Sequence, residues 1–296
     1  KNIIIGKNSS ITKFVCKYLK NTYVFSANEL KETHLKKQIK NYKKINLIFN
    51  NFYPSKNLNT LNTNSYKKFC ELSLGKISFV LEKIPSSKIN KIIYTSSASV
   101  YRISENLNNP NKDDFNRELY SSFKLAAEKL IINFSNNKKK DYSIMRLFNI
   151  YGNSMDEFSF IENVINSKKN NRKINLINNG NSIRDFIHVK DVAKIYKRFI
   201  EKKIENGIYD LGTGSGYLIK DIIDFSNFSK LKIIKINNIN EIHNSIAQNK
   251  NLIKVLKNYK FINLGKYLKQ KLRINKKAIR PILNYANETR KSIING

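Results

Sequence analysis

Two stretches, KIIYTSS at residues 91–97 and ELYSSFKLAAEKLIINF at residues 118–134, decide the fold that we expect. The first is a short apolar run that ends in hydroxyl side chains, which indicates a buried strand. The second repeats apolar residues at helical spacing and places Tyr120 and Lys124 on one face of a helix. A buried strand followed by such a helix is the repeating unit of a parallel sheet covered by helices.

The same alternation continues on both sides of this pair. We expect strands at residues 2–5, 23–25, 45–49 and 142–148, and helices at residues 10–20, 35–42 and 64–83. Because the connections are short, the pattern predicts an α/β fold with a Rossmann-type, doubly wound parallel sheet over residues 1–152.

After Gly152 the pattern becomes less regular. We expect strands at residues 174–177, 186–189, 208–211 and 231–236, helices at residues 158–167, 191–202 and 219–225, and a basic, mostly helical part from about residue 248. Residues 153–296 are assigned mainly to a smaller, mixed C-terminal lobe that binds substrate. Residues from about 186 to 215 are expected to return in part to the first domain.

The composition bounds the possible partners. The 55 Lys and Arg residues against 22 Asp and Glu give a net charge of +33, which favours polyanions in general. The lysines are spread along the chain beside Asn and Ile, which share A/T-rich codons with Lys, so no dedicated nucleic-acid partner is expected. No apolar stretch approaches the roughly 20 residues of a membrane helix, and we expect a cytoplasmic protein without membrane contact.

Cysteine and histidine usage gives no sign of a metal site. Cys16 and Cys70 lie in apolar, helix-like stretches and are interpreted as reduced core thiols. The three histidines, His34, His188 and His243, are far apart and have no ligand partner at short spacing. No metal is therefore expected.

The turn after the first strand has part of the pattern of a dinucleotide site. Gly6 stands where the first glycine makes the tight turn, while Ser9 and Thr12 replace the second and third glycines. Taken alone, an ordinary turn between a strand and a helix explains these residues equally well. We assign Gly6, Ser9, Ser10 and Ile11 to cofactor binding.

Tyr120, Lys124 and Ser97 form a possible acid–base group. A tyrosine hydroxyl has an ordinary pKa near 10 and is a poor base at neutral pH. A lysine cation nearby favours the phenolate and is expected to lower that pKa. Ser97 ends the strand that precedes this helix, so its hydroxyl can reach the same substrate oxygen.

Five motifs together carry a resemblance to a known family. They are TSSASVY (95–101), YSSFKLAAEK (120–129), RLFNIYG (146–152), RDFIHVKDVA (184–193) and YDLGTG (209–214). In order and spacing they resemble the extended short-chain dehydrogenases/reductases, and in particular the nucleotide-sugar members of the NAD-dependent epimerase/dehydratase family. The resemblance covers about residues 1–225.

The resemblance implies a role for each matching residue. Tyr120 would be the acid–base group, and Lys124 would tune it and hold the nicotinamide ribose. Ser97 would bind the reacting sugar oxygen. Asn149 would contact the nucleotide-sugar substrate, and Arg184 would bind its phosphates, which a guanidinium fork suits.

Two further features of the matching motifs bear on function. Within RDFIHVKDVA, His188 is expected to support the lobe, and Asp185 and Asp191 are read as a turn residue and a helix N-cap. The elimination acids of the 4,6-dehydratases are replaced by Ala98 and Ser99, which argues against that activity. We therefore expect a nucleotide-sugar epimerase. An NADPH-dependent keto-sugar reductase, and a non-catalytic protein that binds a dinucleotide or RNA, remain the alternatives.

The cofactor and the oligomeric state are less defined. Ser26 and Asn28 end the second expected strand, where a carboxylate normally binds the ribose diol of NAD. We assign Ser26 to the cofactor site, and nearby Lys31 makes the 2′-phosphate of NADP admissible. NAD is slightly favoured over NADP. The resemblance also implies a homodimer through the helices at residues 64–83 and 118–134.

Overall fold

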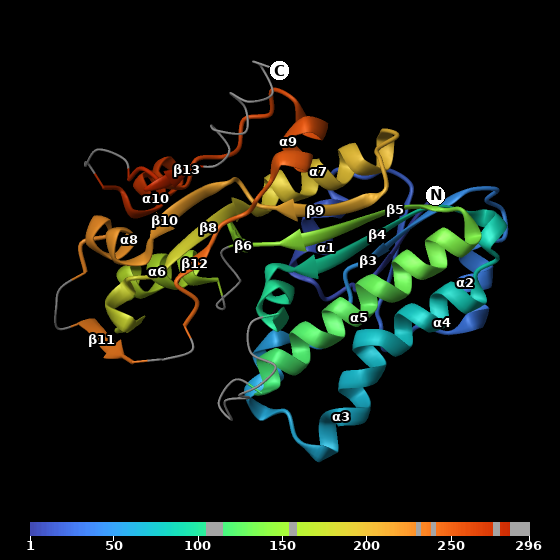
Figure 1. The fold of residues 1–296 in the computed structure, drawn as a ribbon, viewed down its shortest axis with the longest axis horizontal. Helices are drawn as coiled ribbons and strands as arrows, with labels where there is room; N and C mark the ends of the chain where they lie inside the picture. The colour runs from blue at the N-terminus through green and yellow to red at the C-terminus, as the bar shows by residue number, and fades with distance from the viewer. Residues whose placement is uncertain (105–114, 154–158, 229–231, 238–240, 275–278, 285–296) are drawn as a thin grey trace. The chain divides into compact units, whose positions relative to one another are not determined.

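The computed structural model describes residues 1–104, 115–153, 159–228, 232–237, 241–274 and 279–284 (Figure 1). The chain divides into two compact units. The first unit comprises residues 1–146 and 193–209, and the second comprises residues 147–192 and 210–296. Each is described by itself.

A six-stranded sheet forms the centre of the first unit. Its order is β2-β1-β3-β4-β5-β9. The strands are β1 (Asn2–Ile5), β2 (Thr22–Phe25), β3 (Ile45–Phe49), β4 (Ile89–Ser97), β5 (Asp141–Leu147) and β9 (Gly207–Leu211). β1 pairs in parallel with β2 and β3, and β3 pairs in parallel with β4. The expected α/β fold with a parallel sheet is confirmed.

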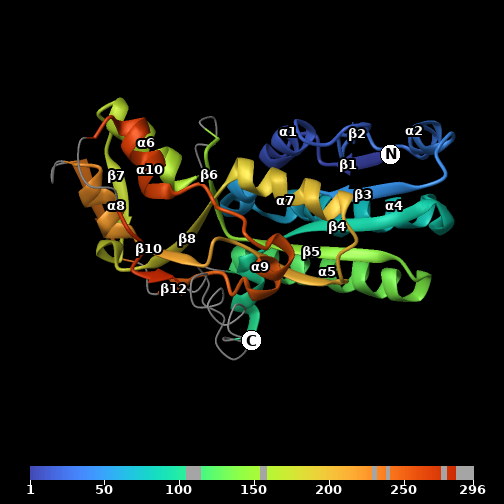
Figure 2. The ribbon, with the colours of Figure 1, turned by 90° about the horizontal axis from the view of Figure 1, so that it is seen from above.

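Helices cover both faces of this sheet. Ile92 and Tyr94 of β4 lie in a core with α2 (Glu32–Ile39), α4 (Lys76–Lys83) and α5 (Phe115–Lys138). The alternating residues Lys91 and Thr95 instead bind α7 (Val189–Glu201), through the Phe199 carbonyl and the Tyr196 hydroxyl. Since successive strand residues point to opposite faces, α7 lies opposite α4 and α5. Both ribbon views show α4 and α5 side by side (Figures 1 and 2).

The helix expected at residues 64–83 is interrupted. It begins as α3 (Thr63–Cys70), passes through a π-helical turn at Glu71–Gly75 and continues as α4. The expectation for the thiols was wrong in one respect. Both cysteines are free, but Cys70 is exposed and Cys16 is only half-buried, so neither is a core residue.

The second unit contains a mixed sheet. Its strand β8 pairs in parallel with β6 and β12 and antiparallel with β10. Strand β10 also pairs antiparallel with β13. These strands are β6 (Asn149–Tyr151), β8 (Ile183–His188), β10 (Ser215–Leu218), β12 (Asn244–Ser245) and β13 (Leu283–Asn284). A separate parallel pair joins β7 (Ile174–Ile177) to β11 (Ile233–Ile236). The helices are α6 (Phe160–Lys169), α8 (Ile219–Phe225), α9 (Lys250–Leu256) and α10 (Leu264–Leu272).

The part after residue 248 is less helical than expected. Its described residues form only α9 and α10, and the chain then adds β13 to the mixed sheet. Within the ranges that the structure describes, no helix combines the length and the hydropathy that a bilayer crossing requires.

Candidate functional site

The turn after β1 requires glycine for a steric reason. Gly6 has a φ of 120°, and a Cβ there would lie 2.6 Å from the carbonyl carbon of Asn50. The Thr12 hydroxyl donates to the Gly6 carbonyl at 2.8 Å and accepts from the Asn50 side-chain amide at 3.0 Å. Thr12 in place of a third glycine therefore binds the turn back to the start of α1 (Ser10–Cys16).

The other residues assigned to the cofactor lie around this turn. Ser9 is the N-cap residue of α1, and Ser10 and Ile11 are its first two residues. Ser26 follows β2 directly and is half-buried. The turn is held to β2 because the Gly6 and Lys7 N–H groups both donate to the Phe25 carbonyl, at 2.9 and 3.1 Å. Small residues with hydroxyl groups, together with the N-terminus of a helix, lie at the ends of these strands. This arrangement suits the binding of a pyrophosphate.

Lys124 and Tyr120 lie one turn apart on α5. The Lys124 ammonium donates to the Thr95 carbonyl at 2.7 Å, and it lies 4.1 Å from the ring centre of Phe52 and 5.9 Å from that of Tyr120. The Phe52 ring also meets the Tyr120 ring edge-on at 4.8 Å. One aromatic ring thus contacts both polar groups.

Burial sets the protonation of this pair. It raises the pKa of Tyr120 to about 12. Burial also lowers the pKa of Lys124 to about 7, although the nearby Glu128 carboxylate opposes this shift. We expected Lys124 to lower the pKa of Tyr120, and this expectation was wrong for the structure described here. Loss of hydration destabilises both charged forms more than the lysine stabilises the phenolate.

Ser97 ends β4, two residues after the carbonyl that binds Lys124. Its hydroxyl accepts from the Ser99 N–H at 3.2 Å. Thr95 was not predicted as a site residue, yet its hydroxyl bonds both the Asn50 side chain and the Tyr196 hydroxyl. Asn50 directly follows the buried strand β3. A polar residue at the end of a buried strand was the sequence signal that could have indicated this hydrogen-bonded group.

A buried ion pair holds the same end of β4 to α5 and β5. Arg146 donates to Glu128 through Nε at 3.1 Å and through Nη2 at 2.7 Å. The Ser96 hydroxyl donates to the same carboxylate, and the Tyr101 ring stacks 4.6 Å from the guanidinium carbon of Arg146. Glu128 and Arg146 lie inside the quoted motifs, but sequence alone did not identify their pairing.

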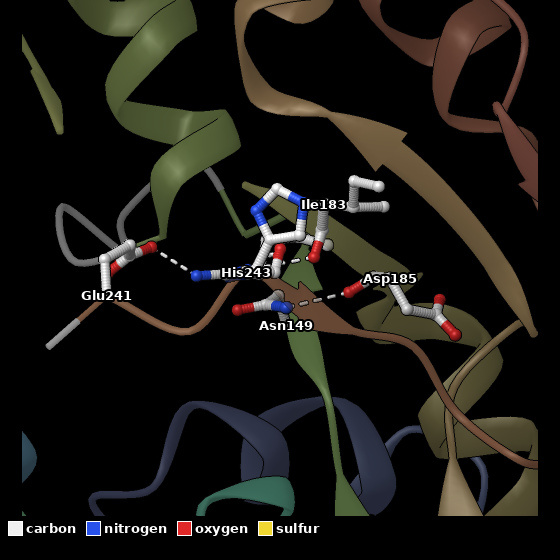
Figure 3. Close-up of polar contacts among 6 residues, drawn as sticks. Asn149, Ile183, Asp185, Glu241 and His243 are labelled. Carbon is white, nitrogen blue, oxygen red and sulfur yellow. Dashed lines mark hydrogen bonds and ion pairs between the residues drawn. The ribbon is translucent and has the colours of Figure 1, made fainter. Parts of the chain in front are cut away.

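Of the three residues assigned to the substrate, Asn149 and Arg184 lie in the second unit. Figure 3 shows the side chain of Asn149 beside Asp185. The Asn149 side-chain amide donates to the Asp185 carbonyl at 2.9 Å. Arg184 forms an ion pair with Glu241 and donates to the His243 carbonyl at 3.3 Å. The structure therefore gathers Ser97, Tyr120, Lys124 and the Gly6 turn in the first unit, and Asn149 and Arg184 in the second.

Asp185 and Asp191 differ from their expected roles. Asp185 lies within β8, fully buried, and its carboxylate accepts the N–H groups of Thr213, Gly214 and Ala247. Burial raises the pKa of Asp185 to about 6, against the lowering effect of these hydrogen bonds. Asp191 lies in the first turn of α7 and accepts from the Tyr259 hydroxyl at 2.7 Å. Both carboxylates join distant segments.

No group of His, Cys, Asp and Glu side chains suited to a metal ion occurs among the residues with described positions. His188 is buried, and its ring meets those of Tyr151 and Tyr267 edge-on.

Comparison with solved structures shows the same fold. The UDP-N-acetylglucosamine 4-epimerase from Methanobrevibacter ruminantium M1, in complex with UDP-N-acetylmuramic acid, aligns with a TM-score of 0.71 at 18% identity and covers 92% of this chain and 97% of its own. RMD from Pseudomonas aeruginosa, complexed with NADPH, aligns with a TM-score of 0.68 at 16% identity and covers 99% of both chains.

Comparison with curated sequences gives similarity over about half of the chain. The dTDP-D-glucose 4,6-dehydratase of Dictyostelium discoideum is 27% identical over 165 residues, which is 51% of this chain and 38% of that protein. The ADP-L-glycero-D-manno-heptose-6-epimerase of Brachyspira hyodysenteriae is 29% identical over 133 residues, 42% of each. These matches thus span less than half of the relatives' own lengths.

The sequence profile of the NAD dependent epimerase/dehydratase family matches residues 63–212, half of the chain. This range includes Ser97, Tyr120, Lys124, Asn149 and Arg184, whereas the turn at Gly6 and Ser26 lie outside it. The chain belongs to the NAD dependent epimerase/dehydratase family.

Proposed function

We propose that this protein is an enzyme that epimerises a nucleotide-linked sugar through transient oxidation of a sugar hydroxyl. The observation that carries the proposal is the Lys124 ammonium bound to the Thr95 carbonyl, one helical turn from Tyr120 and two residues from Ser97 in β4. A protein without catalytic function has no chemical need to keep these three side chains.

Each residue has a distinct task in this proposal. Ser97 binds the reacting sugar oxygen, and Tyr120 exchanges a proton with it. Lys124 holds the nicotinamide ribose one helical turn from Tyr120. A bound nicotinamide would supply a reversible hydride acceptor for that carbon, so the overall reaction would have no net oxidation. Asn149 contacts the nucleotide-sugar, and Arg184 binds its phosphates.

The turn between β1 and α1 supports a dinucleotide as the cofactor. Gly6 allows the close backbone approach at Asn50, and Ser9, Ser10 and Ile11 place hydroxyls and a helix start beside it. Ser26 contributes no carboxylate for a ribose diol, and Lys31 caps α2 as an exposed cation. NAD is our first choice and NADP the second.

One observation favours a reductase as the second candidate. Ser26 offers no carboxylate to the ribose diol of NAD, and the exposed cation Lys31 at the start of α2 suits the 2′-phosphate of NADP. An NADPH-dependent keto-sugar reductase would use that cofactor, with Tyr120 donating the proton to the keto oxygen. A 4,6-dehydratase is disfavoured because Ala98 and Ser99 carry no elimination acid.

The first experiment is to denature the purified protein and identify released dinucleotide by mass spectrometry. NAD near one per chain supports the epimerase, and UDP- and GDP-sugars are then screened for epimerisation. An empty protein that binds NADPH supports the reductase. A protein that binds neither dinucleotide contradicts both enzymes and leaves the non-catalytic alternative.

The Tyr120→Phe variant tests the mechanism directly. It removes the exchanging proton and keeps the ring that packs on Phe52, so turnover should be abolished while dinucleotide binding is kept. Retained turnover by the Phe variant would refute the assigned role of Tyr120.

We also propose a homodimer formed through α3, α4 and α5. Tyr66 of α3 is 46% exposed, and a second chain docked on these helices would cover it. Light scattering coupled to size-exclusion chromatography should give the mass of two chains, and a single-chain mass at micromolar concentration would contradict the proposal.

A further inference from the structure

A cavity of about 910 Å³ lies within the second unit, and neither Asn149 nor Arg184 is among its lining residues. Its volume is in the range of pockets that hold small ligands, roughly 300–1,000 Å³. His188 and Gly152 contribute to its wall, whereas Arg184 does not. At about 3.3 Å per residue, His188 is roughly 13 Å farther along β8 than Arg184.

The cavity concentrates positive charge beyond the basic character of the whole chain. Five of its eleven lining residues are cations: Lys168, Lys169, Lys190, Lys271 and Arg273. In the whole sequence only 55 of 296 residues are Lys or Arg. All five are exposed to solvent. Lys168 also donates to the Asn227 carbonyl, and the ammonium of Lys271 lies 5.6 Å from the ring centre of Tyr267.

Glu162 and Asp191, two carboxylates with described positions near the cavity, are bound by other groups. Glu162 is buried and accepts from the Gly152 N–H and the Tyr267 hydroxyl, both at 2.9 Å. Asp191 is buried and accepts from the Tyr259 hydroxyl and the Ile262 N–H. Within the described ranges of the chain, none of the five cavity cations forms an ion pair with a carboxylate.

Helix ends explain some of these cations but not all. Lys168, Lys169 and Lys271 lie in the last turns of α6 and α10, where cations are favoured by the helix dipole. Lys190 lies in the first turn of α7, where the same dipole disfavours a cation. Arg273 caps α10 with a φ of 53°, although glycine or asparagine suits such a backbone better. Lys190 thus stands where the helix dipole disfavours a positive charge, whereas Arg273 follows the C-terminus of α10, where the dipole favours one.

The wall of the cavity offers uncharged groups as well. The Nδ1 atom of His188 accepts from the Lys190 N–H at 3.1 Å, and its Nε2 atom lies beside Gly152. Tyr267 presents a half-buried ring on the same wall. An anion with several oxygens can use the cations, while an attached ring system can pack on Tyr267.

We propose that this cavity binds a small ligand that carries two or more adjacent phosphate groups, either an inorganic polyphosphate or the polyphosphate chain of a nucleotide. Several phosphate oxygens on one ligand match five cations around one opening, and charge-assisted contacts to phosphate are the strong ones. The proposal does not depend on the activity proposed above, because it uses none of the residues assigned to that activity.

The test is tripolyphosphate binding, measured by isothermal titration calorimetry for two charge-matched variants of the full chain. The cavity variant carries Lys190→Gln, Lys271→Gln and Arg273→Gln. The control variant carries Lys220→Gln, Lys235→Gln and Lys254→Gln, which are exposed lysines of the same unit that do not line the cavity. Both lose three positive charges, so the overall charge of the chain affects them equally.

We expect the cavity variant to bind tripolyphosphate about ten-fold more weakly than the control, from three lost exposed charge contacts. Equal binding by the two variants would overturn the proposal. A second measurement avoids variants. Tripolyphosphate should protect Lys168, Lys169, Lys190 and Lys271 from acetylation in the unmodified protein, and equal protection of exposed lysines outside the cavity would also overturn it.

Two further arms distinguish the ligand sources. ATP should protect the same four lysines at lower concentration than tripolyphosphate if the ligand is a nucleotide, and at similar concentration if it is an inorganic polyphosphate. The Arg184→Gln variant should retain this protection. Loss of protection in that variant would assign the anion to the proposed substrate site and would overturn a separate cavity site.

Discussion

Replacing Glu128 with Gln should unfold the chain at a markedly lower temperature. The Glu128 side chain is 1% exposed and its partner Arg146 14% exposed, so the pair is shielded from water. The carboxylate accepts two guanidinium bonds, at 3.1 and 2.7 Å, and the Ser96 hydroxyl. Removing one partner of a buried pair costs about 3–5 kcal/mol because the remaining charge is unpaired.

This loss is a large part of the total stability of a folded protein, which is about 5–15 kcal/mol. At about 2–4 °C per kcal/mol, the melting temperature should fall by roughly 6–20 °C, measured by circular dichroism. Glu201→Gln is the matched control, because it breaks an exposed pair with Lys197 at 3.8 Å and should cost less than about 1 kcal/mol.

A double-mutant cycle completes the test. Arg146→Met in the Glu128→Gln background removes the unpaired charge, so the double variant should lose less stability than the sum of the two single losses. A melting temperature for Glu128→Gln equal to that of the control, or strictly additive losses, would refute the inference that this pair stabilises the catalytic end of the sheet.

Three further predictions follow from the first unit. Thr12→Val leaves the Gly6 carbonyl and the Asn50 amide without their hydrogen-bond partner. The substitution should lower the free energy of unfolding by about 1–3 kcal/mol and weaken dinucleotide binding. A urea unfolding curve identical to that of the unmodified chain would contradict this prediction. Burial lowers the pKa of Lys124 from 10.5 to about 7. Between these two pH values the unfolded chain therefore binds more protons than the folded chain. The free energy of unfolding should rise over this range by up to about 1.4 kcal/mol per pH unit. Lys124→Met should flatten this rise, and an unchanged slope in pH-dependent unfolding would exclude Lys124 as its source. Phe52→Ala should admit water and raise the pKa of Lys124 toward its ordinary value. The measurement is the pH profile of Lys124 methylation, read by mass spectrometry. A profile that does not change in the variant would show that other groups bury Lys124.

Strand positions followed from the sequence where apolar runs were continuous. The expected ranges at residues 2–5, 45–49 and 174–177 match β1, β3 and β7. Their Ile-rich composition suits a buried strand whatever its neighbours are. The short strands β10 and β13 were not predicted. Gly216 interrupts the apolar pattern of β10, and the two strands that pair are more than sixty residues apart in the chain.

In the candidate site, too, features that depend on neighbouring residues were predicted, and features that depend on distant segments were not. The turn at Gly6 and the spacing of Tyr120 and Lys124 were predicted, because both depend on residues close together in the chain. Asp185 was read as a turn residue, yet it lies in β8 and binds the Thr213 and Ala247 N–H groups. Such bonds depend on which distant segments meet, and local sequence does not encode that.

The sequence by itself determined the order of strands and helices from β1 to β5, the glycine turn, and the placing of Tyr120 and Lys124 on one helix face. These features depend on side-chain period, backbone sterics and residue type, which act over a few residues. Only the tertiary structure decided that Phe52 buries both groups, that Thr12 bonds the Gly6 turn, and that Glu128 pairs with Arg146. Burial and charge pairing act through space, so protonation at this site became readable only once the distant segments were placed together.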